Sequence, residues 1–496
     1  MINKIVVVGG GSSGWMTAAS LINHFPEKEI VVIESPDYPT IGVGESTVQY
    51  IRPWMHSLGI KDEDWMEECN ATYKVSIRFE NWDGKGGHFH YPFGTPVYTQ
   101  NEEFDLYNFA RLKEEVPNNE WAEVFFPAAL MSENNLLVNE MEGWNIKQNS
   151  AYHFDAIRFA QWLKNKYCIP RGVKVINQTV FAVDLNKQGY VERLQCDVGF
   201  GEKPMMNEDA ITADLYIDCT GFKGMLANAL NIPFKDYSYG LINDSAWATQ
   251  LPENYPNMFY TNCTALGHGW VWKTPTKERT GTGYVFSSRY ISDDDALEEF
   301  KKHLNRDDEI DFRLLKWKHG RREKFAYKNV VTVGLSAGFI EPLESGGLFT
   351  THEMLKELVK SLQRNTFSGA EKDGFNFAMT NRFDDFADFV VQHYQYSTRT
   401  DTAYWRDAPK FKLRNNNSLK EFYLDSYRHS MVRPSNAHFN SIAFGLGFNS
   451  VSDYDASFEM LFDGRDMKSE GVNYRKWVLA RQKKWLEYIK KNAVNK

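Results

Sequence analysis

A glycine-rich turn between a buried strand and a helix constrains the fold of this chain more than any other feature. Residues 4–8 read as a strand because they end in a continuous run of β-branched side chains. The turn Gly9–Gly14 follows with the spacing G-x-G-x-x-G, and residues 15–25 read as a helix. A second apolar strand, residues 30–33, ends in Glu34. This order predicts a nucleotide-binding βαβ unit in an α/β protein.

Each part of the turn has a physical role in that prediction. Gly9 permits the tight bend, Gly11 lets a pyrophosphate approach the backbone, and Gly14 lets the helix lie close to the strand. Ser13 is a further candidate contact, because the helix N-terminus offers free N–H groups to phosphates. Glu34 can accept hydrogen bonds from both ribose hydroxyls and would repel a 2′-phosphate, which disfavours NADP. The turn alone does not distinguish FAD from NAD.

Segments further along the chain favour FAD. Two more buried strands are predicted at residues 214–221 and 329–334, with β-rich segments inserted between them. The strands of the nucleotide-binding sheet are thus spread over about the first 334 residues, which fits a large FAD-binding fold better than a compact NAD domain. The candidate flavin contacts outside the first turn are Gly42, Val43, Gly44, Glu45 and Gly334.

The C-terminal third has a different pattern. Residues 353–362, 375–394 and 474–491 read as helices, with apolar side chains at three- and four-residue steps. We therefore expect an α/β protein whose residues 1–353 form an FAD-binding, Rossmann-like module of the flavoprotein monooxygenase (GR2) type with inserted substrate-side sheet segments. Residues 354–496 are expected to form a mostly helical subdomain that covers a substrate pocket.

Composition sets limits on partners and compartment. The net charge of -8 gives no reason to expect nucleic acid as a partner. No apolar run approaches the length of a membrane span, and the N-terminus lacks the pattern of a signal peptide, so a cytoplasmic protein is expected. The five cysteines are odd in number and show no C-x-x-C spacing. We expect neither a disulfide framework nor a metal site.

A series of further motifs runs over roughly the first 410 residues, and only their combination is specific. They are Gly9–Trp15, Gly42–Ser46, Asn70–Lys74, Ile77–Phe79, Trp82, Tyr152–Asp155, Asp218–Phe222, Trp270–Pro275, Gly283–Ser288, Gly320–Arg322, Gly334–Ser345, Arg399–Thr402 and Tyr404–Arg406. In this combination and order the sequence resembles the flavin-dependent halogenases of the tryptophan-halogenase type.

The resemblance implies a reaction. Reduced FAD, supplied by a separate NAD(P)H-dependent flavin reductase, reacts with oxygen to give a flavin hydroperoxide. Halide attacks this species, and the hypohalous acid that forms moves through the protein to a lysine. There it halogenates an electron-rich, indole-like aromatic substrate. Chloride, bromide and iodide all remain open.

Two residues match the catalytic pair of this family. Lys74 matches the lysine, and the alternation of the residues after it predicts that a strand begins near Tyr73. Protonated, Lys74 could hydrogen-bond hypohalous acid; neutral, it could form a haloamine. Glu344 matches the glutamate that stabilises the arenium cation or takes its proton. Glu341 lies three residues earlier and is the alternative carboxylate.

Further residues match the halide site and the barrier between flavin and substrate. Ser345, Gly346 and Gly347 match the segment whose backbone N–H groups hold halide, and Gly346 stands where the family pattern has threonine. The missing side chain makes a roomier site for bromide or iodide conceivable. Trp270 and Trp272 alternate on a predicted strand and match the pair that bars substrate from the flavin.

The substrate side matches less closely. His90 and Phe93 lie in the loop where tryptophan-specific relatives place aromatic contacts, but the residue directly before the proline is Tyr91 rather than histidine. Most soluble oligomers are symmetric, so a homodimer is the oligomeric state that we would expect first.

Two other functions compete with this one. The first is an FAD-dependent aromatic monooxygenase, which would hydroxylate its substrate. Against it, such enzymes carry a Gly-Asp pair on the last nucleotide strand, whereas Gly334 is followed here by Leu335. The second is a flavin-binding protein without catalysis, and the presence of Lys74 and Glu344 argues against that reading.

Overall fold

The structure is a computed structural model. It describes residues 1–37, 45–99, 117–197, 210–253, 255, 258–306, 310–364, 366–411, 441–442, 445–446 and 467–495. The candidate flavin contacts Gly42, Val43 and Gly44 and the side chain of Glu45 lie outside the described part.

The described residues group into two compact units, each assembled from three stretches of the chain. The first unit comprises Met1–Ala71, Phe154–Asp244 and Lys316–Ala387. The second unit comprises Thr72–His153, Ser245–Leu315 and Asp388–Lys496. The expected boundary between residues 353 and 354 lies inside helix α11 (Gly346–Leu362). The two units therefore interleave along the sequence in a way that one linear boundary does not describe.

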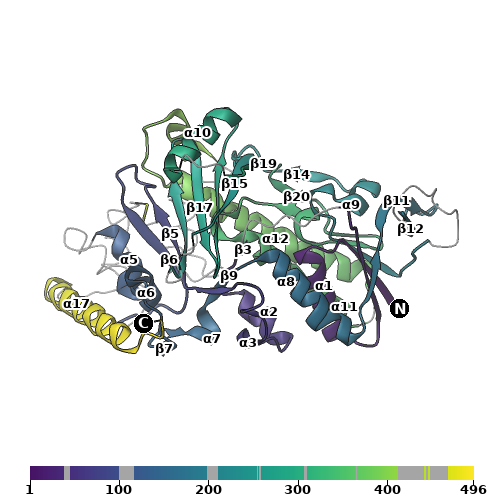
Figure 1. Cartoon of the computed structure of the whole chain (residues 1–496), viewed down its shortest axis with the longest axis horizontal. Helices are drawn as coiled ribbons and strands as arrows, with labels where there is room; N and C mark the ends of the chain where they lie inside the picture. The colour runs from purple at the N-terminus through teal and green to yellow at the C-terminus, as the bar shows by residue number, and fades with distance from the viewer. Residues whose placement is uncertain are drawn as a thin grey trace. The chain divides into compact units, whose positions relative to one another are not determined.

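A six-stranded sheet forms the centre of the first unit (Figure 1). Its strands, in spatial order, are β10 (Lys174–Asn177), β2 (Glu29–Glu34), β1 (Lys4–Val8), β13 (Leu215–Asp218), β22 (Val330–Thr332) and β21 (Ala326–Tyr327). The pairings are parallel except that β21 runs antiparallel to β22. The four strands predicted from apolar runs are therefore confirmed. Their continuous apolar runs reflect burial on both faces of a parallel sheet.

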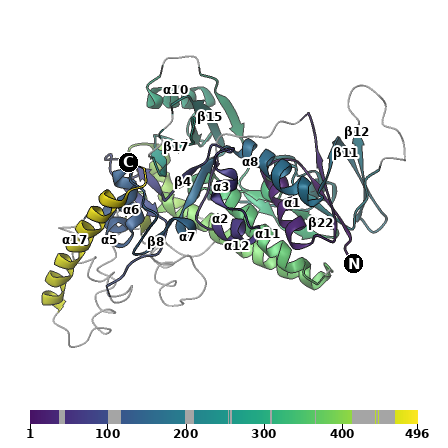
Figure 2. The ribbon, with the colours of Figure 1, turned by 60° about the horizontal axis from the view of Figure 1, so that its bottom comes forward.

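Helices cover both faces of this sheet. Helix α1 (Ser12–His24) starts directly after the turn and packs beside α8 (Ala156–Trp162) and α11. On the opposite face, α9 (Met225–Ala229) and a two-stranded ribbon, β11 (Thr179–Leu185) with β12 (Val191–Asp197), share one apolar core with β1 and β2. The two strands of the ribbon lie side by side in Figure 2. This is the layered α/β architecture that the sequence predicted.

A seven-stranded sheet forms the centre of the second unit. Its strands, in spatial order, are β19 (Arg313–Lys316), β15 (Ser245–Leu251), β18 (Thr280–Phe286), β17 (Gly269–Pro275), β16 (Tyr260–Ala265), β5 (Ser76–Glu80) and β6 (His88–Pro92). Strands β16 and β5 pair in parallel, whereas β15–β18, β18–β17, β17–β16 and β5–β6 pair antiparallel. This sheet corresponds to the inserted β-rich segments.

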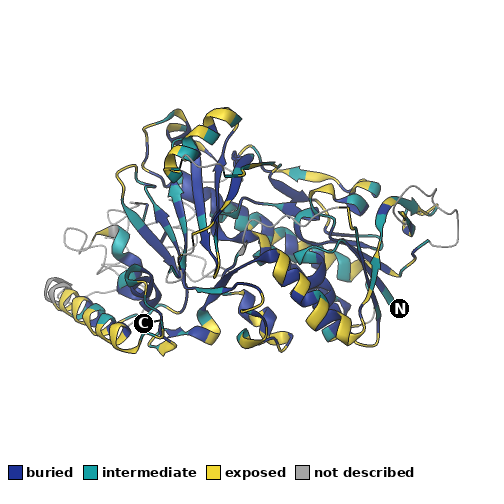
Figure 3. Cartoon of the chain, viewed as in Figure 1, coloured by how far each residue is buried: buried dark blue, intermediate teal, exposed yellow. Residues whose placement is uncertain are grey.

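Helices also line this second sheet. Helix α10 (Asp293–Leu304) packs Ala296 and Phe300 against Tyr284 and neighbouring side chains of the sheet. Helices α5 (Trp121–Phe125) and α6 (Pro127–Asn134) lie beside β6, and α6 also lies beside β5. Helix α17 (Met467–Asn492) packs on both α5 and α6. In Figure 3 the strands are mostly buried, whereas α10 exposes one side to solvent.

The described elements after residue 362 are helical, as predicted. They are α12 (Gly369–Gln395), α13 (Ala403–Asp407), the short 3₁₀ segment Ala408–Lys410 and α17. Among the described residues, no helix is both long enough and apolar enough to cross a bilayer.

Candidate active site

The glycine-rich turn has the geometry of a dinucleotide site. Gly9 has a φ of 119°, and a β-carbon there would overlap the carbonyl oxygen of Cys219. A β-carbon at Gly14 would overlap the carbonyl oxygen of Gly9, so α1 approaches the strand more closely than any other residue would permit. Strand β1 lies between β2 and β13, which places the turn at the switch point of the sheet. Ligands of open α/β sheets bind at this position.

Two candidate flavin contacts from distant parts of the sequence lie side by side. Gly334 has a φ of 72°, and a β-carbon there would overlap the hydroxyl of Ser13. The Ser13 Oγ lies 3.4 Å from Thr351 Oγ1 on α11. Gly11 is the N-cap residue of α1 and provides no side-chain cap, so the first N–H groups of the helix face the turn. The residues present therefore fit the phosphates of a dinucleotide such as FAD.

The acidic residue of this site has a partner that the sequence did not indicate. Glu34 forms an ion pair with Lys164, which lies in a π-helical segment, Leu163–Cys168. Lys164 also lies 5.7 Å from the centre of the Trp15 ring. No local pattern links Glu34 and Lys164, because 130 residues separate them. A ribose that binds Glu34 would share the carboxylate with this ammonium group.

Glu344 lies at the end of a short 3₁₀ helix, Pro342–Glu344, and is 2% exposed. The next residue, Ser345, has a left-handed φ of 56° and donates a hydrogen bond from its hydroxyl to Ser46 Oγ at 3.0 Å. Helix α11 then begins at Gly346. The alternative carboxylate, Glu341, is fully buried and accepts a hydrogen bond from Asn243 Nδ2 at 2.8 Å. The two carboxylates therefore have different surroundings.

A small pocket lies at the start of α11. Gly334, Gly346, Gly347 and Phe386 are among the residues that line it. A β-carbon at Gly346 would overlap the Phe386 ring, whereas nothing lies within 4 Å of one at Gly347. The candidate halide segment and the candidate flavin contact Gly334 thus border one cavity. Backbone N–H groups at a helix start suit an anion there.

Lys74 ends strand β4 (Thr72–Lys74), which pairs antiparallel with β9 (Ala151–Phe154). Its side chain is 0% exposed, and Nζ lies 5.3 Å from the centre of the Phe93 ring. An aromatic face attracts an ammonium group at this separation. A strand does begin near Tyr73, but it ends at Lys74, and the alternating residues after it form a separate strand, β5. The lysine is not a surface residue. Lys74 and Phe93 both belong to the second unit, whereas Glu344 belongs to the first.

His153 lies on β9 opposite Thr72 and is also fully buried. Its Nε2 lies 2.9 Å from Thr261 Oγ1, and its Nδ1 lies 3.4 Å from Thr72 Oγ1. Burial, with a smaller contribution from the charge of Lys74, holds the pKa of His153 well below its ordinary value. The imidazole therefore stays neutral at neutral pH and adds no second positive charge beside Lys74.

The two tryptophans lie on strand β17, as predicted. Trp270 is 0% exposed and Trp272 is 9% exposed, and their ring centres are 6.3 Å apart. Gly283 on β18 pairs with Trp272, and a β-carbon there would overlap the Trp272 indole. The indole thus lies across the backbone of the neighbouring strand, in space that only a glycine leaves open.

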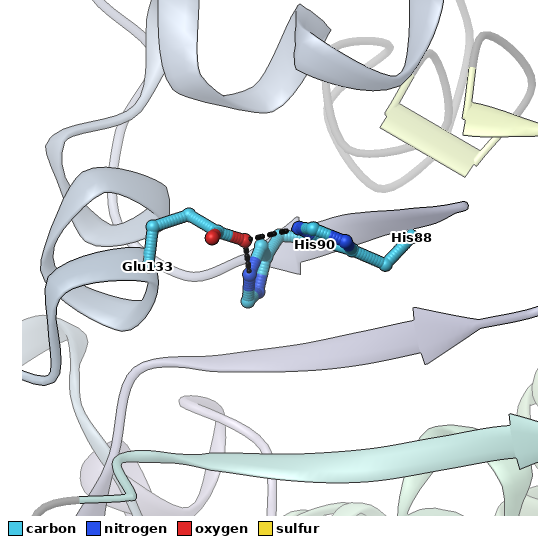
Figure 4. Close-up of side chains that lie close together, drawn as sticks. All are labelled: His88, His90 and Glu133. Carbon is cyan, nitrogen blue, oxygen red and sulfur yellow. Dashed lines mark hydrogen bonds and ion pairs between the residues drawn. The ribbon is translucent and has the colours of Figure 1, made fainter. Parts of the chain in front are cut away.

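The two candidate substrate contacts lie in different surroundings. Phe93 lies beside Lys74. His90 lies on strand β6 together with His88, and the Nε2 atoms of both histidines are 2.7 Å from Glu133 Oε1 (Figure 4). Burial lowers the pKa of His90. Against the effect of its own burial, the contacts with both histidines hold the pKa of Glu133 below its ordinary value. The sequence did not indicate this three-residue cluster.

The comparisons with known proteins agree on one family. The family model described as "Tryptophan halogenase" matches residues 4–449. The chain is 33% identical over 451 residues to tryptophan 7-halogenase RebH of Lentzea aerocolonigenes, covering 87% of this chain and 83% of the relative. It is 36% identical over 434 residues to 7-chloro-L-tryptophan 6-halogenase KtzR of Kutzneria sp. (strain 744), covering 82% and 81%.

Solved structures share the fold over nearly the whole chain. The VirX1 apo structure superimposes with a TM-score of 0.88 at 36% identity, covering 99% of this chain and 98% of the other. Tar14, a tryptophan C-6 flavin-dependent halogenase (chlorinase) from taromycin biosynthesis, superimposes with a TM-score of 0.84 at 29% identity, covering 98% and 97%.

Proposed function

This chain belongs to the tryptophan halogenase family, and on that premise we propose that it transfers the halogen of hypohalous acid to an electron-rich, indole-like ring at Lys74. As a flavin-dependent halogenase it uses FAD, halide, a separate flavin reductase and an aromatic substrate. The observation that carries the proposal is the complete burial of Lys74 against Phe93. A lysine rarely loses all contact with solvent unless it has a specific partner or function.

The first unit would hold the flavin and the halide. Gly9, Gly11, Ser13 and Gly14 would contact the pyrophosphate, and Glu34 would accept hydrogen bonds from the ribose. Bound reduced FAD would give two electrons to oxygen, and oxygen at the peroxide level would take two more from halide, which leaves an electrophilic halogen species and water.

The halide would lie at the start of α11, held by the backbone N–H groups of Ser345, Gly346 and Gly347. The pocket there is bordered by Gly334, a candidate flavin contact. This shared border supports the assignment, because the halide has to reach the oxidising end of the flavin. We propose that Trp270 and Trp272 bar the aromatic substrate from that end.

Lys74 would activate the oxidised halogen. As an ammonium group it donates a hydrogen bond to the oxygen of hypohalous acid, which makes the halogen more electrophilic. As a neutral amine it exchanges a proton for the halogen and releases water, which gives a haloamine. In both cases the ring carbon attacks the halogen, and the bond from the halogen to oxygen or nitrogen breaks. The neutral state of His153 avoids a repulsive charge beside this group.

Glu344 would complete the substitution. The ring carries a positive charge after it has gained the halogen, and a carboxylate nearby stabilises that charge and accepts the ring proton. The near-complete burial of Glu344 strengthens both effects, because fewer water molecules screen the carboxylate.

A product assay tests the proposal. Purified protein is supplied with FAD, a flavin reductase, NADH, oxygen and chloride, bromide or iodide, and is offered indole, tryptophan and phenols. We expect products whose mass and isotope pattern show one halogen in place of one hydrogen. A Lys74→Met variant serves as the control, because its side chain is of similar length and carries no charge. Hydroxylated products would instead favour the monooxygenase, and flavin binding without any product would favour a non-catalytic flavoprotein.

A further inference from the structure

Three side chains with metal-binding atoms converge between β6 and α6. His88 and His90 lie two residues apart on β6, so both point to the same face of the strand. Glu133 comes from the last turn of α6. One ligand atom from each of the three residues lies within 4.8 Å of the other two (Figure 4). Sequence patterns based on cysteine did not indicate this site, since none of its members is a cysteine.

A chain of hydroxyl groups behind His90 fixes which of its nitrogens carries a proton. His90 Nδ1 lies 3.0 Å from Ser76 Oγ, which lies 2.7 Å from Ser132 Oγ. The Ser132 hydroxyl in turn donates to the carbonyl oxygen of Ala128 at 3.0 Å. These three contacts need three protons, and the two serines supply only two. The third proton therefore comes from His90, whose Nδ1 donates to Ser76.

This assignment leaves the other ring nitrogen of His90 facing an anion. With the proton on Nδ1, the Nε2 lone pair of a neutral ring lies 2.7 Å from Glu133 Oε1. Two acceptors at this distance repel each other unless the ring gains a second proton or a cation lies between them. His90 is 1% exposed, so little water reaches these two atoms. A metal cation between them satisfies both.

We propose that His88, His90 and Glu133 bind one divalent transition-metal ion, with Zn²⁺ as the best match. Two imidazoles and one carboxylate form a known ligand set for zinc, which leaves a fourth position for water. A histidine ligand whose other nitrogen donates to a fixed acceptor, as His90 does to Ser76, is the usual arrangement around such a metal. Tetrahedral ligands of zinc are about 3.3 Å apart at normal bond lengths. The imidazoles therefore need to withdraw from Glu133 by about 0.6 Å.

Among the described residues, three further titratable side chains interact with the cluster. Glu120 and Glu123 lie near enough to Glu133 to interact with it electrostatically. Arg78 is the opposing positive charge, and it interacts with His90 from β5. Its guanidinium also donates to Tyr260 at 3.2 Å and lies over that ring.

The metal would act as a structural link within the second unit. It would join α6 to β6, and the chain leaves β6 at Pro92 directly before Phe93, whose ring contacts Lys74. Binding of Zn²⁺ would thus stiffen the segment that carries Phe93 without a role in electron transfer. This inference is independent of the halogenation reaction, because it concerns binding and stability alone.

A zinc titration tests the proposal. Tag-free, full-length protein is treated with EDTA, dialysed and titrated with Zn²⁺ in competition with a chromophoric chelator, and its melting temperature is recorded with and without Zn²⁺. We expect one Zn²⁺ per chain and a higher melting temperature in its presence. His88→Gln and Glu133→Gln should each lower the affinity for Zn²⁺ by at least about 100-fold, because each removes a side chain that binds the metal directly. Ser76→Ala should lose about 10- to 100-fold.

A second histidine–glutamate pair in the same unit provides a matched control. His268 and Glu299 lie 3.2 Å apart with side-chain exposures of 28% and 27%, against 32% and 26% for His88 and Glu133. His268→Gln should leave zinc affinity unchanged. The proposal is overturned if the His88→Gln and Glu133→Gln variants bind Zn²⁺ as the unchanged protein does, or if the unchanged protein binds none. If both variants fail to fold, crystals of the unchanged protein treated with Zn²⁺ provide the test. An anomalous peak at the zinc edge between His88, His90 and Glu133 would support the proposal, and a peak elsewhere or no peak would overturn it.

Discussion

The ring of Phe386 occupies the space that a β-carbon at residue 346 would need. A large aromatic side chain on α12 therefore fills the space beside this glycine. The missing side chain at residue 346 leaves no open volume on this side for a larger halide. The two residues form a pair, and each limits what the other can be.

We expect Gly346→Thr to destabilise the protein by about 1–3 kcal/mol, as overpacking of a core does. The same substitution in a Phe386→Leu background should cost less, because the ring no longer fills the space. Thermal or urea unfolding of the two single variants and the double variant gives the coupling energy. Strict additivity would show that the two residues do not compete for one volume.

Lys74→Met should abolish halogenated product while the protein keeps its fold. The thioether side chain has a similar length and fills the same buried position, but it neither donates a hydrogen bond nor forms a haloamine. The measurement compares product by mass spectrometry with hypohalous acid captured by an added phenol scavenger. If the Lys74→Met variant forms nearly as much halogenated product as the unchanged protein, Lys74 has no role in the reaction.

Glu344→Gln should lower the turnover number severely without a comparable rise in KM. The amide keeps the shape of the carboxylate but accepts no proton and carries no charge, so the loss lies in the transition state. Steady-state kinetics with circular dichroism on the same samples checks both parts. Glu341→Gln is the informative comparison, because Glu341 lies three residues away and binds Asn243 instead.

Gly283→Ala should destabilise the protein by about 1–3 kcal/mol, because the new methyl group overlaps the Trp272 indole. The cost should fall in a Trp272→Leu background. Denaturant unfolding of the four proteins in this cycle measures the interaction. If Gly283→Ala lowers the free energy of unfolding equally in both backgrounds, the clash is with the Trp247 carbonyl oxygen, which also lies near this β-carbon.

Folding stability should decrease as the pH falls below neutrality. Burial lowers the pKa of His319 from 6.5 to about 4, against smaller opposing effects of the Asn243 carbonyl, Asp244 and Asp236. Between these two pKa values the unfolded chain binds a proton that the folded chain does not, so acid favours unfolding. At pH 5 this difference amounts to about 2 kcal/mol. In urea unfolding measured from pH 7 to pH 5, His319→Gln should reduce the loss of folding stability by up to that amount.

Local patterns predicted the nucleotide half of the fold well. The strand at residues 4–8, the turn after it and the strand ending at Glu34 depend on neighbours in sequence, and the structure contains them nearly as expected. Helix α11 begins at Gly346 rather than near residue 353. The prediction started late because two adjacent glycines weaken a helical pattern.

The side-chain contacts around the candidate site could not be predicted, because they join residues that are far apart in the sequence. Lys164 reaches Glu34, and Phe386 fills the space beside Gly346, without any periodic signal in the sequence. The surroundings of His90 depend on strand register. A shift of one residue along β6 exchanges the two faces, so His90 points with His88 toward Glu133 and away from the face of Tyr91.

The interleaving of the two units restricts how this protein can be recombined with its relatives. A chimera with a single crossover anywhere between residues 72 and 387 would divide at least one hydrophobic core between two parents. Transplanting the surroundings of Lys74 into another halogenase therefore requires the exchange of three separate segments at once. Directed evolution by gene shuffling should yield few folded progeny unless its crossovers coincide with the five points where the chain passes from one unit to the other.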